Sequence, residues 1–129
     1  MRIILILFLT VLVSTSYGQK TKCQDFKNGN FIILSDNGSK TIITRKGKTQ
    51  TEQIVGTDDK MSLKVHWIDD CTYTLKMKKS LSYFLQPKEI RNMVIVAHIT
   101  KTTANSYLLD VSSNVMDLVI KMELIRVKP

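Results

Sequence analysis

A short polar segment contains the residues best suited to bind a ligand. Arg45, Gln50, Glu52 and Gln53 lie on two neighbouring strand candidates, so a hairpin can bring them onto one surface. If the sheet closes on itself, some of them face inward, need hydrogen-bond partners and could form the polar end of a ligand cavity. The alternative, which we favour from the sequence alone, is a hydrophilic edge strand whose charges prevent edge-to-edge association.

A second group with metal-binding side chains is His66, Asp69 and Asp70. Metal sites normally use three or four ligands that are held by further hydrogen bonds. Here His66 falls on the outer face of a predicted strand, and the aspartates are typical turn residues. His98, the other histidine, is out of phase with its apolar neighbours and is also expected to face outward. We therefore predict no metal site and no cofactor.

The sequence also lacks the motifs that accompany common catalytic sites. It contains no G-x-S-x-G, H-E-x-x-H or C-x-x-C motif and no glycine-rich phosphate loop. Its carboxylates fall in turns or on polar strand faces, and few aromatics are present to line a polysaccharide groove. We therefore expect a protein that is not an enzyme and has no catalytic residues.

These polar groups must be positioned by strands, because alternating and β-branched segments recur along the chain with turn residues between them. The pattern predicts an all-β fold, an antiparallel meander of about eight strands forming a small barrel or strongly coiled sheet. At most one short helical turn is expected, near 87–91, and a two-sheet sandwich is the alternative. The strand candidates are 31–35, 40–45, 49–55, 62–68, 71–77, 93–102, 106–112 and 115–127.

The clearest hairpin lies in the middle of the chain. Leu63, Val65 and Trp67 share one face of its first strand, and Tyr73 and Leu75 share the corresponding face of its second strand. Trp67 lies close to the turn, so we expect it to meet Tyr73 in an aromatic corner at one end of the core. Both aromatics are also candidate ligand contacts.

The N-terminal residues 1–18 have the pattern of a secretory signal peptide. Arg2 precedes an apolar run over 3–13, and Ser16 and Gly18 occupy the −3 and −1 positions of a cleavage site before Gln19. The run is too short for a membrane-spanning helix, which needs about 20 apolar residues. We predict cleavage after residue 18, a single β domain over 19–129 with no transmembrane span, and a secreted or periplasmic location.

The charge of the remaining chain is +7, because removing Arg2 leaves 18 Lys and Arg against 11 Asp and Glu. The basic residues are scattered and are not interleaved with aromatics, as a platform for single-stranded nucleic acid would require. Nucleic acid is therefore not an expected partner, and a monomer is expected.

Two cysteines, Cys23 and Cys71, remain after the leader. In an oxidising compartment, an even pair in a small domain is typical of a disulfide, although two free thiols are the alternative. A bridge would tie the N-terminal segment to the middle of the chain and stabilise the fold by about 4 kcal/mol.

The motifs C-x-x-F-K-x-G-x-F from Cys23, R…Q-x-E over 45–52 and W-x-x-D-C-x-Y-x-L from Trp67 resemble those of a family of small exported proteins. These proteins come from Gram-negative, Bacteroidota-type bacteria, and the resemblance covers about residues 23–127. It implies export, a Cys23–Cys71 bridge and a β-rich fold, and it implies no activity. A looser likeness, in architecture alone, is to lipocalin-like barrels.

The function expected from these features is binding. A barrel-like exported protein could hold a small apolar or amphipathic ligand, or an envelope component, in or at its mouth. The alternative is a structural or interaction protein that contacts another envelope protein or an anionic surface through its basic face or a sheet edge.

Overall fold

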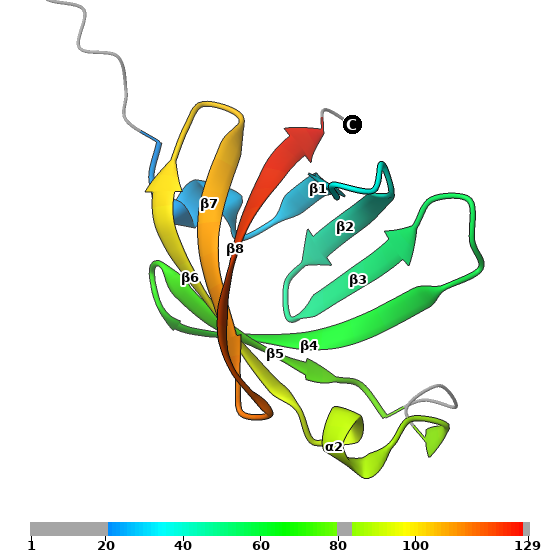
Figure 1. Ribbon diagram of the computed structural model, residues 1–129. Coiled ribbons are helices and arrows are strands. Elements are labelled where there is room, and N and C mark those ends of the chain that lie inside the picture. The colour runs from blue at the N-terminus through cyan, green and yellow to red at the C-terminus, as the bar shows by residue number, and fades with distance from the viewer. Residues whose placement is uncertain (1–20, 80–83, 128–129) are drawn as a thin grey trace, which may run out of the picture.

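The computed structural model describes residues 21–79 and 84–127, which form an eight-stranded antiparallel β-barrel (Figure 1). The predicted signal peptide, 1–18, lies outside the described residues. The strands are β1 (Gly29–Leu34), β2 (Lys40–Lys46), β3 (Thr49–Ile54), β4 (Lys60–Asp69), β5 (Thr72–Met77), β6 (Val94–Thr102), β7 (Ser106–Ser113) and β8 (Met116–Val127).

The strands form a simple meander, each pairing with its neighbours in the sequence, and β1 pairs with β8 to close the barrel. The all-β barrel prediction is therefore confirmed, and the sandwich alternative is excluded. The preference for a hydrophilic edge strand was wrong, because β3 pairs with β2 on one side and with β4 on the other. Its polar residues therefore cannot be explained as protection of a sheet edge.

Side chains alternate between the interior and the outer surface, as the pleat of a strand requires. On β2, Ile43 and Arg45 are buried while Ile42, Thr44 and Lys46 are exposed. Burying one apolar face of each strand stabilises the closed sheet by about 25 cal/mol per Å². The buried apolar residues are Phe26, Phe31, Ile43, Leu63, Val65, Tyr73, Leu75, Ala97, Ile99, Tyr107, Leu109 and Leu124.

The closing contact between β1 and β8 is short. Three residue pairs join these strands, Asn30–Val127, Phe31–Arg126 and Ile32–Ile125, whereas seven join β7 to β8. Within the described chain, the first part of β8 therefore has a hydrogen-bonded neighbour on one side. Met116, Leu118 and Val119 of this part are 46%, 57% and 59% exposed.

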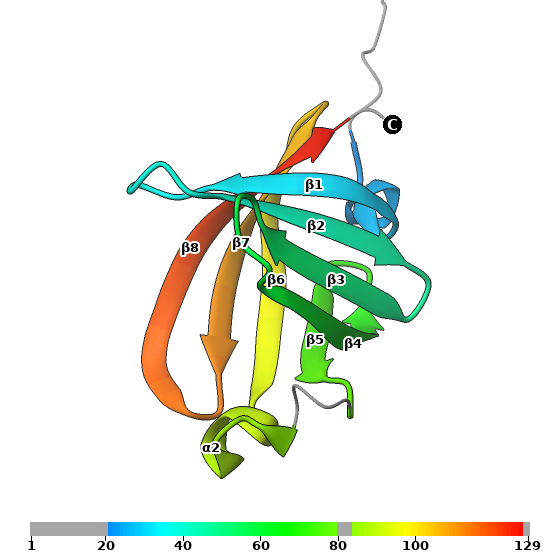
Figure 2. The same cartoon turned by 90° about the vertical axis from the view of Figure 1, so that its right-hand side faces the viewer.

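Two short helical elements lie at opposite ends of the barrel (Figure 2). At one end is the 3-10 turn η1 (Cys23–Phe26), which the sequence analysis did not predict, and its Phe26 is buried in the core. At the other end is α2 (Lys88–Arg91), which confirms the helical turn expected near 87–91. Pro87 directly precedes α2, where its fixed φ suits a helix start. No helix in the described ranges is long and apolar enough to cross a membrane.

Candidate functional site

Arg45 lies inside the barrel at the end closed by η1. It is 1% exposed, and its guanidinium donates hydrogen bonds to elements from across the fold. Nη1 donates to the Phe26 carbonyl at 2.8 Å, and Nη2 donates to the hydroxyls of Tyr73 at 3.0 Å and Tyr107 at 2.7 Å. Nε donates to Gln50 Oε1 at 2.9 Å. The planar fork of arginine suits this role, because it presents donors in several fixed directions.

Aromatic rings surround the guanidinium and complete the closed end. The Arg45 Cζ lies 4.5 Å from the ring centroid of Tyr73 and 5.2 Å from that of Phe31, within the range of cation–π attraction. Trp67 packs on Tyr73 with 4.6 Å between centroids, which confirms the predicted aromatic corner. Phe26 and Tyr107 pack at 5.1 Å. Because Arg45 is 1% exposed and is surrounded by protein partners, we assign it a structural role at this closed end.

Gln50 connects the buried arginine to Glu52. Arginine can only donate, so the Gln50 side chain must present its oxygen to Arg45 and its amide nitrogen to the other side. Gln50 Nε2 accordingly donates to Glu52 Oε1 at 2.9 Å. The Arg45 charge is therefore linked through one neutral amide to a carboxylate nearer the open end, and Glu52 Oε1 is held as an acceptor.

Burial shifts the pKa of two groups in this network. Desolvation raises the pKa of Glu52 above its ordinary value, opposed by the Gln50 hydrogen bond and the Arg45 charge. Desolvation also raises the pKa of the Tyr73 phenol well above its ordinary value. Tyr73 is therefore neutral at neutral pH and serves Arg45 as a hydroxyl acceptor.

A cavity of about 530 Å³ lies in the half of the barrel opposite η1, and Glu52 is part of its lining. This volume lies within the range of about 300–1,000 Å³ typical of small-molecule sites. Inward-facing strand residues make its walls, and α2 and the β3–β4 turn border it. Its apolar lining is Ile54, Met61, Leu63, Leu75, Met77, Ile90, Met93 and Ile95, and its polar lining is Thr41, Glu52, Asp58, Asp59, Lys60 and Gln86.

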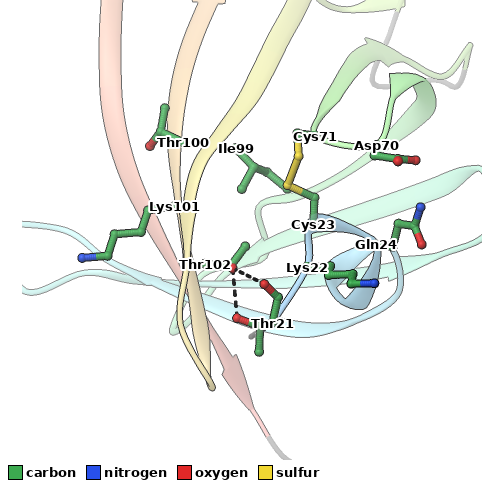
Figure 3. Close-up of a pocket in the computed structure, with 10 residues that line it drawn as sticks. All are labelled: Thr21, Lys22, Cys23, Gln24, Asp70, Cys71, Ile99, Thr100, Lys101 and Thr102. Atoms are coloured by element: carbon green, nitrogen blue, oxygen red, sulfur yellow. Dashed lines mark hydrogen bonds between the residues drawn. A yellow bond between two sulfur atoms is a disulfide. The ribbon is translucent and has the colours of Figure 1, made fainter. Parts of the chain in front are cut away.

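A second hollow, of about 420 Å³, lies outside the barrel beside the disulfide (Figure 3). It is lined by the N-terminal segment and β6, which are joined where the Thr102 hydroxyl donates to the Thr21 carbonyl at 2.8 Å. Its floor contains Ile99 and the Cys23–Cys71 bridge. Its charged lining residues, Lys22, Asp70 and Lys101, are all exposed on the outer surface, whereas the barrel mouth contains the partly buried Glu52, so the barrel mouth is the better candidate site.

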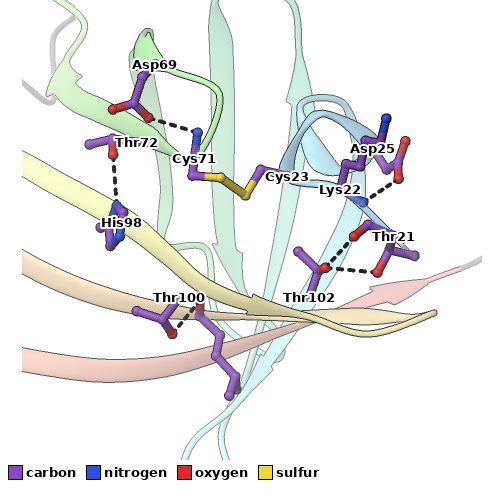
Figure 4. The surroundings of a disulfide bond; sticks show 11 residues. Thr21, Lys22, Cys23, Asp25, Asp69, Cys71, Thr72, His98, Thr100 and Thr102 are labelled. Atoms are coloured by element: carbon purple, nitrogen blue, oxygen red, sulfur yellow. Dashed lines mark hydrogen bonds between the residues drawn. A yellow bond between two sulfur atoms is a disulfide. The ribbon is translucent and has the colours of Figure 1, made fainter.

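Cys23 and Cys71 are joined by a disulfide with Cα atoms 5.2 Å apart, so the free-thiol alternative is excluded (Figure 4). The bridge fastens η1 to the turn before β5. At that turn, Asp69 accepts a hydrogen bond from the Cys71 amide at 2.9 Å, and this bond lowers the pKa of the exposed Asp69 carboxyl. The disulfide therefore holds Phe26 in place over the closed end.

The candidate polar residues divide between the two faces of the sheet. Arg45, Gln50 and Glu52 meet inside the barrel, as the first interpretation of the polar segment expected, while Gln53 is exposed on the outside. His66 and His98 are exposed, and His98 shares a 2.9 Å hydrogen bond with Thr72. Over residues 21–79 and 84–127, no three His, Cys, Asp or Glu residues are grouped so as to hold a metal ion.

Comparison of the chain with protein-family models, with curated proteins and with solved structures finds no match. The function must therefore be argued from the geometry of the barrel.

Phe26 and Tyr107 were not predicted from the sequence as partners of Arg45. The phase of β7 offered a signal for Tyr107, because Tyr107, Leu109 and Val111 share one face of the strand while Asp110 and Ser112 fall on the other. Phe26 gave no periodic signal, since it belongs to a single helical turn. The cavity lining was also missed, because it combines residues from several strands, a turn and α2.

Proposed function

We propose that this protein is an exported, non-enzymatic β-barrel that binds a small apolar or amphipathic ligand in its open end. The cavity lined by Glu52 carries the proposal, because it combines apolar walls with a few polar residues, among them the partly buried carboxylate of Glu52. Sites for small molecules commonly have this composition, in which apolar contacts supply affinity and a few polar groups fix orientation.

Export is supported by the signal-peptide pattern of residues 1–18 and by the disulfide, which is typical of proteins from oxidising compartments. Membership of the family of small exported proteins that the motifs resemble is part of the same proposal. The hydrogen-bonded network of Arg45 at the closed end supports binding as well. It holds that end of the barrel in one arrangement, so the cavity stays formed when it is empty.

Native mass spectrometry of the protein purified from the cells that export it tests the proposal. A small molecule bound in one-to-one ratio is the expected result. An empty chain that co-purifies with another protein would contradict it and favour the interaction protein.

A variant pair tests whether the ligand occupies the barrel. Met77→Trp places an indole in the cavity, while Lys76→Trp places the same group on the outer face of β5. We expect the neutral apolar dye N-phenyl-1-naphthylamine, excited directly, to bind the unsubstituted chain and Lys76→Trp with equal affinity and Met77→Trp at least tenfold more weakly. Equal binding to both variants would place the dye outside the barrel.

The second candidate function is docking of another envelope protein on β8. The exposed apolar residues Met116, Leu118 and Val119 and the short contact with β1 favour it, because an unpaired strand edge can accept a further strand. The co-purification result described above would support this candidate.

A further inference from the structure

The cavity in the barrel mouth has a carboxylate whose hydrogen-bonding capacity is only partly used. Glu52 Oε1 accepts from Gln50 Nε2 at 2.9 Å, and no other hydrogen bond or ion pair reaches this carboxylate from the described residues. An ionised carboxylate has about four acceptor positions on its two oxygens. Glu52 therefore retains acceptor capacity on the side that faces the cavity.

The orientation of the network determines what kind of group can bind there. Arg45 fixes the Gln50 amide, and Gln50 then donates to Glu52. The guanidinium donates to Gln50, the Phe26 carbonyl and the two tyrosine hydroxyls, and neither Arg45 nor Gln50 lines the cavity. A ligand headgroup that contacts Glu52 is therefore favoured when it donates hydrogen bonds, whereas a carboxylate or phosphate headgroup would meet the acceptor oxygens of Glu52 at that position.

The charge of the cavity lining favours a cation among possible donors. Three carboxylates, those of Glu52, Asp58 and Asp59, line the cavity together with one ammonium group, that of Lys60, in a chain whose formal charge is +8 overall. The mouth is thus locally acidic on a basic protein, and opposite charge near a partly desolvated carboxylate is attractive. The other lining residues are mostly apolar, so the rest of the ligand must be apolar too.

We propose that the barrel mouth binds a single-chain amphiphile with a cationic amine headgroup, the amine donating to Glu52 and the apolar chain packing against residues such as Met61, Leu75 and Ile95. This inference rests on the proposed binding function and names the ligand class for the same cavity. Charge-assisted hydrogen bonds are shorter and stronger than neutral ones, so Glu52 discriminates between headgroups while the apolar wall supplies affinity common to all chains of equal length.

Three probes of equal chain length test this proposal: decylamine, 1-decanol and decanoate, each titrated calorimetrically at pH 7 into the disulfide-bonded protein. We expect decylamine to bind at least tenfold more tightly than 1-decanol, which is about 1.4 kcal/mol, and decanoate to bind most weakly. Glu52→Gln removes the charge at nearly constant size, so it should weaken decylamine binding at least tenfold and leave 1-decanol binding unchanged. Glu123→Gln, which neutralises an exposed carboxylate on β8, should change neither.

The outcomes separate the two proposals. If none of the probes binds, the binding function itself fails. If 1-decanol binds and decylamine gains nothing over it, or if decanoate binds most tightly, the cavity binds ligands but the amine assignment is overturned. Far-UV circular dichroism checks that Glu52→Gln is folded, and Glu52→Asp, which keeps the charge, should retain part of the preference for the amine. If neither variant folds, the order of the three probes on the unsubstituted chain decides the question.

Discussion

Replacing Arg45 by Met tests the role of the buried guanidinium most directly. Methionine is unbranched and apolar, so the substitution removes the donors while filling the space of the aliphatic stem of Arg45. It leaves four acceptors, on Gln50, Phe26, Tyr73 and Tyr107, without the N–H groups that they face at 2.7–3.0 Å. It also removes the positive charge of Arg45, which is linked to Glu52 through Gln50.

The expected loss of stability follows from these contacts. Hydrogen bonds to a charged group contribute about 1.5–3 kcal/mol each, so simple addition over four bonds would suggest about 6–12 kcal/mol. The true loss is smaller, since bonds in one network are not additive and the two tyrosine hydroxyls, 3.4 Å apart, can bond to each other. We expect about 3–5 kcal/mol, as for other buried polar networks that lose one partner. Such a loss is a large part of the total stability of a domain, which is about 5–15 kcal/mol.

Urea unfolding followed by far-UV circular dichroism measures this loss with the disulfide intact in every sample. Lys46→Met is the matched control, because it removes the same charge from the next residue of β2, which is exposed, and it should cost less than about 0.5 kcal/mol. Arg45→Lys, which keeps the charge but not the planar fork, should fall between the two. A loss below about 1 kcal/mol for Arg45→Met, with an unchanged dependence on urea, would refute the structural role assigned to the network.

Three further predictions concern other parts of the barrel. Replacing both Cys23 and Cys71 by Ser should lower the free energy of unfolding by about 4 kcal/mol, since the bridge spans 48 residues; an unchanged urea midpoint would contradict this. Burial raises the pKa of Glu52 in the folded chain, so the folded state takes up a proton more readily than the unfolded one, and stability should fall as pH rises from the ordinary value of 4.5 through the raised value. In urea midpoints measured from pH 3.5 to 7, Glu52→Gln should lack the fall in stability that the titration of Glu52 causes. Parallel curves for the variant and the unsubstituted chain would contradict this assignment. Gly29→Ala should cost about 1–3 kcal/mol, because φ is +143° and the new Cβ would lie 3.2 Å from the Phe31 ring. Gly38→Ala should cost less, because its φ is also positive, +85°, but its new Cβ would meet nothing within 4 Å, and thermal melts of the two variants measure the difference.

The strands and their faces could be predicted because burial on one side leaves a clear period of two in the sequence. Trp67 and Tyr73 illustrate this, since the hairpin that places them together is local and its register follows from a short turn. The helical turn after Pro87 was likewise signalled by one residue with a fixed φ.

The position of the polar residues could not be derived in the same way. Arg45 and Gln50 lie on the inward phase of their strands, but an inward charge is stable only with partners, and those partners come from η1, β5 and β7. Strand order decides whether β3 is an edge, and in this meander β3 pairs with β2 and β4. The long-range contact between β1 and β8 decides instead whether the inward face of β3 becomes an enclosed interior. Local patterns carry no information on that contact, so the sequence did not show where the polar residues would find partners.

The short seam between β1 and β8 also bears on how the chain folds. Every other strand pairing joins consecutive segments, so its loop-closure entropy is small and its hairpin can form early. The seam must instead bring together residues about a hundred positions apart, and its ladder contains only three residue pairs. Folding of the meander thus consists of local pairing steps with a small loss of chain entropy, followed by one closure with a larger loss. The buried network around Arg45, which joins β2, β5 and β7, supplies the cooperativity that such a late step requires.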